Sequence, residues 1–273
     1  MAIKVASHFF YSIIKAGRTL SSNMMIKDIV TASILGCKVH LVNMAEAVQI
    51  IEHLVEDRTT CSQVVTLNAE IIYQTKKEEE LQEIINRANL VTADGIGTVW
   101  GARILGYPQK ERVSGIDLLH ELCASGASRG EKIYLLGAAP GVAEKAGHNL
   151  EQSYPGLKVC GSWHGYFSPE DEQAIIADIN SKSPDILFAA LGAPKQEYWI
   201  DQKRDTLKVP VCMGVGGSFD VIAGIKKRAP RLFIVLNLEW LYRLLTEPSR
   251  WKRQLALPAF VLAVLRQKYG RNK

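Results

Sequence analysis

The stretch DILFAALGAPKQ, residues 185 to 196, shows the pattern that decides the fold. Its apolar residues follow one another without alternation, and the run stops at a glycine and several polar residues. Continuous apolarity marks a strand that is covered on both faces, which is typical of a parallel sheet between two layers of helices. Six further runs have this form: residues 37–43, 62–68, 88–95, 131–141, 157–167 and 209–220.

Helical patterns separate most of these runs. In MAEAVQIIEHLVED, residues 44 to 57, apolar residues recur at helical spacing. SPEDEQAIIADINSKSP, residues 168 to 184, opens with a serine suited to cap a helix and with an acidic first turn. The alternation predicts βαβ units. We therefore expect an α/β protein with a Rossmann-like, mostly parallel sheet and helices on both faces.

Polar residues stand directly after the predicted strands. The segments concerned are TLNAE (66–70), TADGIG (92–97), LGAAPG (136–141), LGAPKQE (191–197) and GVGGSFD (214–220). Ligands of open α/β sheets bind at the carboxyl ends of the strands. The five segments therefore predict one shared cleft.

The charge of the chain is distributed unevenly. From Lys226 to the end there are twelve Lys and Arg residues against two Glu, so this segment carries +10 and the remaining residues carry −5. Such clustering indicates a polyanionic partner, either nucleic acid or an anionic membrane surface. No nucleic-acid-binding module accompanies the charge. A basic helix with Trp and Leu suits the lipid headgroup zone, so we favour the membrane surface.

The same tail has a plainer interpretation, in which four of its apolar residues form the buried face of an ordinary helix. These residues are Trp240, Leu241, Leu244 and Leu245. No stretch supplies the roughly 20 apolar residues that a spanning helix needs. We expect three regions: an N-terminal extension over 1–33, a catalytic core over 34–235 and a membrane-associating appendage over 236–273. The five scattered cysteines predict buried free thiols.

Asp94 follows a buried strand, in VTADGIG. A partly desolvated carboxylate at this position is suited to act as a general base toward a hydroxyl. The alternative is that the Asp-Gly pair only turns the chain.

The loop GVGGSFD differs from a dinucleotide-binding fingerprint, because Phe219 stands where that motif needs a glycine. Its glycines, Gly214, Gly216 and Gly217, still allow a phosphate to approach the backbone, and Ser218 can bind one. The Asp220 carboxylate can accept hydrogen bonds from ribose hydroxyls. The turn at Gly137 is of a nucleotide-binding type. A tight turn with no ligand is the alternative in each case.

The sequence has no D-x-D motif and no His, Asp or Glu cluster at metal-ligand spacing. We therefore expect neither a metal nor another cofactor, and side-chain cations or helix N-termini must then neutralise any bound phosphate.

Five motifs in order, TLNAE, TADGIG, RVSGIDL (112–118), LGAPKQE and GVGGSFD, make the chain similar to the WecG/TagA/CpsF family of bacterial glycosyltransferases. The resemblance extends from Ile34 to Arg253. The members that it resembles most transfer N-acetylmannosamine from UDP to undecaprenyl-diphosphate-linked N-acetylglucosamine in wall teichoic acid synthesis. The resemblance implies an inverting enzyme without a required metal, peripheral on the cytoplasmic face of the plasma membrane and able to form homo-oligomers.

The resemblance also implies roles for single residues. Asp94 would deprotonate the 4-hydroxyl of the acceptor. Thr66 and Asn68 would line the same pocket, and Arg112 and Gln196 would hold sugar or phosphate. Asp220 and the glycines before it would bind the nucleotide, and Tyr166 would stack on uracil. The donor diphosphate would receive cations from Arg243, Arg250 and Arg253.

Three alternatives remain open at this point. Related members use N-acetylmannosaminuronic acid, glucose or glucuronic acid, and no residue selects the donor sugar. A nicotinamide-dependent oxidoreductase is the second alternative, which the missing G-x-G-x-x-G disfavours. The third is a membrane adaptor without catalytic activity.

Overall fold

The computed structural model describes residues 29–248 and 251–270. Its main sheet has six strands, and every neighbouring pair is parallel. From one edge to the other the strands are β4 (Leu90–Ala93), β3 (Ser62–Leu67), β8 (Val211–Gly214), β7 (Ile186–Ala190), β5 (Lys132–Gly137) and β6 (Lys158–Trp163). The predicted parallel α/β architecture is confirmed. Residues 1–28 of the predicted extension over 1–33 lie outside the described residues, and β1 begins within its last residues.

One predicted strand belongs to a second, smaller sheet. The run at 37–43 forms β2 (Cys37–His40), which pairs antiparallel with β1 (Thr31–Ile34). This hairpin packs beside the β4 edge, where the Val91 N–H donates to His40 Nδ1 at 2.9 Å. A run of apolar residues indicates that both faces of a strand are buried. A hairpin covered by helices meets this condition as well as a central strand does, so the run alone cannot tell the two apart.

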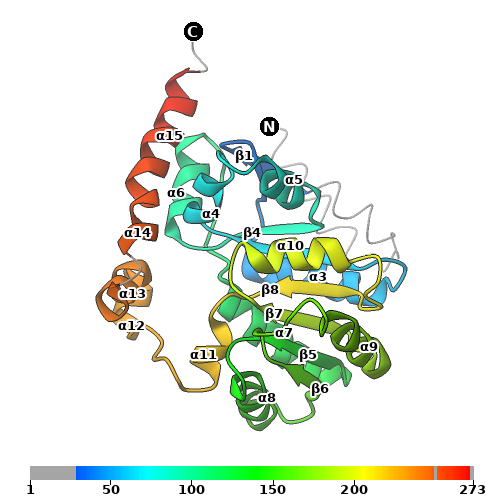
Figure 1. Cartoon of the computed structure of the whole chain (residues 1–273). Coiled ribbons are helices and arrows are strands. Elements are labelled where there is room, and N and C mark those ends of the chain that lie inside the picture. The colour runs from blue at the N-terminus through cyan, green and yellow to red at the C-terminus, as the bar shows by residue number, and fades with distance from the viewer. Residues whose placement is uncertain (1–28, 249–250, 271–273) are drawn as a thin grey trace.

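Helices occupy both faces of the main sheet (Figure 1). They are α3 (Met44–Glu56), α4 (Ala69–Gln74), α5 (Glu79–Arg87), α6 (Ile96–Ile104), α7 (Gly115–Arg129), α8 (Val142–Ser153), α9 (Glu172–Lys182), α10 (Lys195–Lys203) and α11 (Ser218–Ile222).

The starts of two predicted helices, α3 and α9, can be compared with the local sequence. The Asn43 side chain accepts from the Glu46 N–H, and the Glu46 carboxylate accepts from the Asn43 N–H, so a capping box starts α3. The predicted serine cap of α9 is wrong. Ser168 instead donates to the Asp171 carboxylate, and Asp171 becomes the residue before the helix.

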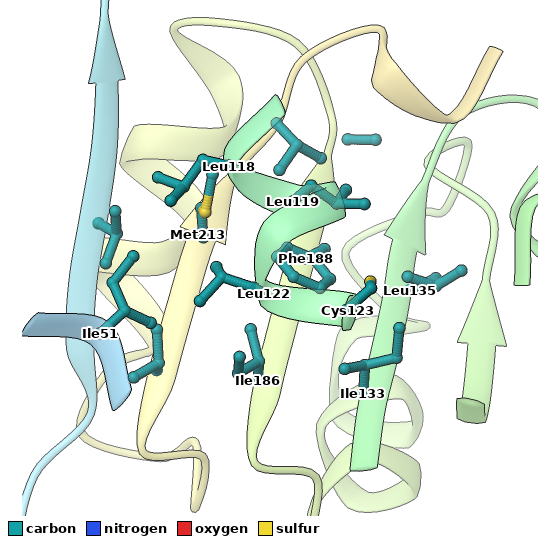
Figure 2. Packing of buried hydrophobic residues seen from close by; sticks show 14 of the residues in the cluster. Ile51, Leu118, Leu119, Leu122, Cys123, Ile133, Leu135, Ile186, Phe188 and Met213 are labelled. Carbon is teal, nitrogen blue, oxygen red and sulfur yellow. The ribbon is translucent and has the colours of Figure 1, made fainter. Parts of the chain in front are cut away.

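Alternate strand residues face opposite core layers. One layer packs α3, α7 and α8 against the sheet, with residues such as Leu122, Ile133 and Phe188 in contact (Figure 2). The other layer contains α9 and α10 over β5, β7 and β8. Beside it, α4, α5 and α6 pack with the hairpin over β3 and β4. The strands are thus buried between helix layers, which fixes the positions of the loops at their carboxyl ends.

The order of the strands reverses near the centre of the sheet. The chain passes from β3 outward to β4, then crosses to β5 and β6, and returns through β7 to β8 beside β3. A crevice opens at the carboxyl ends where the order of an α/β sheet reverses. The polar segments that the sequence places after β3, β4, β7 and β8 meet at this edge.

Four helices follow the sheet along one side of the molecule (Figure 1). They are α12 (Arg231–Val235), α13 (Glu239–Thr246), α14 (Trp251–Gln254) and α15 (Ala256–Gly270). In α15, Phe260 and Val264 are buried in the core layer of α4 and α6. The Gln267 side chain accepts from the Leu35 N–H at 2.8 Å and donates to the Ser33 carbonyl at 2.9 Å.

The apolar residues of α13 are not a buried face. Trp240 is 40% exposed and Leu245 is 66% exposed, and α13 buries no side chain completely. No helix within residues 29–248 and 251–270 is long and apolar enough to span a bilayer. Of the five free cysteines, four are buried and Cys160 is partly exposed.

Candidate active site

A cavity of about 1180 Å³ lies at the carboxyl edge of the sheet. Its walls are the segments after β3, β4, β5, β6, β7 and β8, the start of α7, and parts of α13, α14 and α15. The predicted single cleft is therefore present, and the segment after the sheet closes one side of it.

Asp94 follows β4 and lines this cavity. Burial raises the pKa of its carboxyl group from 3.8 to about 6, and the charge of Glu239 acts in the same direction. The cations of Arg243 and Arg112 and the backbone N–H of Gly115 act against this rise in pKa. At neutral pH the group is therefore an ionised carboxylate of raised basicity, as a general base requires.

The start of α7 supports this carboxylate. Ser114 caps the helix, and Gly115 is its first residue. Gly115 lies against β3, because an added Cβ would stand 3.0 Å from Thr66 Oγ1. This contact brings the Gly115 N–H, at the positive end of the helix dipole, within hydrogen-bonding reach of Asp94.

Thr66 and Asn68 line the cavity as predicted. Thr66 Oγ1 donates to the Gly214 carbonyl at 3.2 Å, which links β3 to β8. The Asn68 side chain accepts from the Ile71 N–H at 3.0 Å and caps α4. Both side chains therefore fix the floor of the cavity as well as facing it.

Gln196 also lines the cavity, and its amide holds the glycine loop. The amide oxygen accepts from the Gly216 N–H at 3.0 Å, and the amide nitrogen donates to Glu197 Oε1 at 2.9 Å. At Gly214 an added Cβ would stand 2.4 Å from the Gln196 amide nitrogen, so a larger residue there would displace the Gln196 amide. Gln196 and the loop after β8 form one packed unit.

The predicted nucleotide residues divide into two groups. Gly216, Gly217, Ser218 and Asp220 line the cavity, whereas Gly137 and Gly214 do not. Gly137 has a φ of 134°, and an added Cβ there would stand 2.4 Å from the Ala190 backbone. Gly137 is therefore required by the approach of β5 to β7.

The side chains of Ser218, Asp220 and Tyr166 differ in their contacts and exposure. Ser218 Oγ donates to the Val215 carbonyl at 2.6 Å. Asp220 lies 3.1 Å from Lys226 Nζ. Tyr166 lines the cavity and is 76% exposed, so its ring is accessible to a ligand.

Helix α13 brings two opposite charges into the cavity. Arg112 Nη1 donates to Glu239 Oε2, and the two side chains are 15% and 14% exposed. Arg112 Nη2 also lies 3.8 Å from Asp117. Arg243, one turn after Glu239, is exposed and acts electrostatically on Asp94.

The other two predicted arginines have different outcomes. Arg253 lines the cavity, and its Nε donates to Glu70 Oε1, after β3. Arg250 lies outside the described residues.

Two charged residues of the segment after β8, Glu239 and Lys226, line the cavity but were not predicted as site residues. In the sequence, Glu239 counted only as one of two acids balancing the basic tail. The signal that would have found it is its spacing, because residues i and i+4 share one helix face and Arg243 was already a candidate. Lys226 contacts Asp220 from six residues further along the chain.

Within the described ranges, no group of three or more His, Cys, Asp or Glu side chains is placed to hold a metal ion. Lys195, the first residue of α10, lines the cavity together with the cations and carboxylates named above.

Comparison with known proteins decides the family. The model of the glycosyl transferase WecG/TagA/CpsF family matches residues 32–273. The chain belongs to this family. It is a glycosyltransferase, and the oxidoreductase and adaptor alternatives fall with this result.

Three similar proteins are 34% to 38% identical to the chain over the aligned residues. A protein of Bacillus spizizenii is 35% identical over 77% of the chain and 81% of its own length. A protein of Bacillus subtilis is 34% identical over 84% of the chain and 89% of its own length. A protein of Staphylococcus aureus is 38% identical over 75% of the chain and 80% of its own length. All three are named N-acetylglucosaminyldiphosphoundecaprenol N-acetyl-beta-D-mannosaminyltransferase.

Proposed function

We propose that the chain transfers N-acetylmannosamine from UDP-N-acetylmannosamine to undecaprenyl-diphosphate-linked N-acetylglucosamine, as in wall teichoic acid synthesis. The names of its relatives support the acceptor and the transferred sugar. The observation that carries the mechanism is the Asp94 carboxylate, with its pKa raised to about 6, in a cavity that also contains cations.

The reaction proceeds by direct displacement. Asp94 removes the proton from the acceptor 4-hydroxyl while that oxygen attacks the anomeric carbon of the donor sugar. The bond from this carbon to the diphosphate oxygen breaks, the configuration inverts, and UDP leaves with the electron pair. Arg243 and Arg253 stabilise the charge that develops on the departing diphosphate, with Arg250 as a third cation.

The walls of the cavity divide the binding of the two substrates. The loop from Gly216 to Asp220 takes the nucleotide, with Tyr166 stacking on the base. Thr66, Asn68, Arg112 and Gln196 surround the sugars next to Asp94. Both sets of residues line the same cavity at the carboxyl edge of the sheet, which supports binding of the two substrates next to each other.

The appendage places the enzyme on the cytoplasmic surface of the membrane. Most of the strongly exposed large apolar residues of the described chain lie in α12 to α15, and the same segment carries the excess of Lys and Arg. Apolar side chains enter the headgroup zone, and each cation near an anionic surface adds roughly 1 kcal/mol of attraction. The lipid-linked acceptor then reaches the cavity without leaving the bilayer.

The test offers the purified chain a panel of UDP-sugars with a soluble analogue of the lipid acceptor, and identifies the product by mass. The panel contains N-acetylmannosamine, N-acetylmannosaminuronic acid, glucose and glucuronic acid donors. We expect a disaccharide product with UDP-N-acetylmannosamine and release of one UDP per product. Transfer of another sugar would overturn the donor assignment, and no transfer from any donor would overturn the proposed reaction.

A further inference from the structure

Helix α13 is attached to the core mainly by charge. Unlike α15, it contributes no fully buried side chain. Phe233 and Tyr242 pack together with ring centroids 5.5 Å apart, but this contact joins α12 to α13 and not to the sheet. Two ion pairs join α13 to the core: Arg112 with Glu239 at its start, and Lys226 with Glu247, 3.0 Å apart, just after its end.

The ion pair at the start of α13 is the more buried of the two. Arg112 and Glu239 are 15% and 14% exposed, whereas Lys226 and Glu247 are 45% and 28% exposed. Exposed ion pairs contribute little because water screens them, whereas removing one partner of a shielded pair leaves an uncompensated charge. Glu239 therefore determines where the first turn of α13 sits.

The position of that turn fixes the position of Arg243. Residues 239 and 243 are one helical turn apart and lie on the same face. Glu239 is engaged by Arg112, and within residues 29–248 and 251–270 no hydrogen bond or ion pair engages the Arg243 side chain. Arg243 thus remains a free cation whose charge reaches Asp94.

We propose that Glu239 is a positioning residue for the reaction: its ion pair with Arg112 seats α13 so that Arg243 faces the cavity beside Asp94. In this role Glu239, although it lines the cavity, acts on the reaction through Arg243. The inference rests on the proposed function, since it assigns Arg243 to the departing diphosphate. It adds that a carboxylate on the same helix aims this arginine.

The opposite hypothesis makes Glu239 a competitor. In that case its carboxylate occupies Arg112 in place of a substrate phosphate, and its removal would make the enzyme faster or bind the donor more tightly. The position of Arg112 between two carboxylates, Glu239 and Asp117, favours a built structural junction over a vacant anion site.

The experiment is a double-mutant cycle on the full chain with Glu239→Gln, Arg243→Ala and the combined variant. We expect Glu239→Gln to lower kcat about 10-fold or more and Arg243→Ala to lower it about 100-fold. At pH 8, where Asp94 is ionised in every variant, the combined variant should be no slower than Arg243→Ala, because Glu239 acts through Arg243. Losses that multiply, or an unchanged or raised kcat in Glu239→Gln, would overturn the proposal.

Two variants separate this role from general damage to the fold. Glu239→Asp keeps the charge on a shorter side chain and should recover part of the lost kcat. Glu247→Gln removes the ion pair at the other end of α13 and should cost less than 3-fold in kcat. Equal losses in Glu247→Gln and Glu239→Gln would show that any weakening of the appendage suffices, which also overturns the proposal.

A readout without catalysis keeps the proposal testable if the proposed reaction fails. Hydrogen exchange of the α13 backbone amides should be faster in Glu239→Gln than in the parent chain, while exchange in β3 and β7 is unchanged. Absence of transfer in the parent chain would remove the proposed function only. Unchanged exchange in α13 would remove the positioning role, whatever the reaction.

Discussion

Helices α13 and α15 follow the same sheet and line the same cavity, yet they are attached to the core in different ways. Phe260 and Val264 of α15 are 1% and 0% exposed among the side chains of α4 and α6. In α13, by contrast, no side chain is fully buried, ion pairs join the helix to the core, and Leu245 is 66% exposed. Figure 1 shows α15 beside α6, and α13 further along the same side.

The difference separates fixed from adjustable parts of the site. Asp94 belongs to the packed part, because it follows β4 and accepts from the first N–H of α7. Arg243 belongs to the part held by charge. A base needs a fixed position. We propose that Arg243, on a helix held by ion pairs, moves into place with the lipid-linked acceptor and so limits hydrolysis of the donor in its absence.

The largest expected effect comes from the fixed part. Asp94→Asn should reduce transfer about 1000-fold, because the reaction loses its general base. Affinity for UDP, measured by calorimetry, should remain within about 2-fold, since the nucleotide loop is untouched. Turnover close to that of the parent chain would place the base elsewhere.

The two helices should respond differently to the loss of an apolar side chain. Phe260→Ala should lower the free energy of unfolding by about 3–4 kcal/mol, because it leaves a cavity in the core. Leu245→Ala, the matched change in α13, should cost less than about 0.5 kcal/mol. Urea denaturation measures both values, and equal losses would show that α13 is packed as firmly as α15.

The sequence predicted the strands and the position of Asp94 better than it predicted how the C-terminal helices contact the core. Continuous apolar runs located β3, β4, β5, β7 and β8, and the polar segments after them located Asp94. Local rules did not reveal that Phe260 joins the core, because LALPAFVLAVL is equally compatible with a membrane-facing helix. The partners of Arg112 and Arg253 depend on contacts across more than 100 residues, which spacing cannot show.

The raised pKa of Asp94 also predicts an effect on stability. The folded chain binds the Asp94 proton more tightly than the unfolded chain, because the pKa rises from 3.8 to about 6. The stability that this proton contributes is complete below about pH 4 and is lost as the pH rises through about 6.

Asp94→Asn removes this dependence. At pH 8 the variant should therefore be more stable than the parent chain by about 3 kcal/mol, and the difference should vanish near pH 4. Urea midpoints at both pH values measure it. A variant that is less stable than the parent chain at pH 8 would contradict the raised pKa of Asp94.

The smallest effect concerns the exposed apolar residues of the adjustable part. Replacing Leu236 and Leu245 together by Ser should weaken binding to vesicles of anionic phosphatidylglycerol by about 10-fold, measured by sedimentation. Turnover of a soluble acceptor should be unchanged. Vesicles of neutral phosphatidylcholine are the control, and undiminished binding of the double variant to anionic vesicles would place the membrane contact outside α12 and α13.

The measurement that tests the central claim most directly is the pH dependence of kcat/KM for the parent chain and for Arg243→Ala. Asp94 must be ionised to act, so the rate should rise with pH and level off above about 6. Arg243 lowers the pKa of Asp94, so Arg243→Ala should move this rise to higher pH as well as reduce the plateau. A profile without a rise near pH 6, or one that Arg243→Ala leaves in place, would contradict a base on the sheet that works beside a cation from α13.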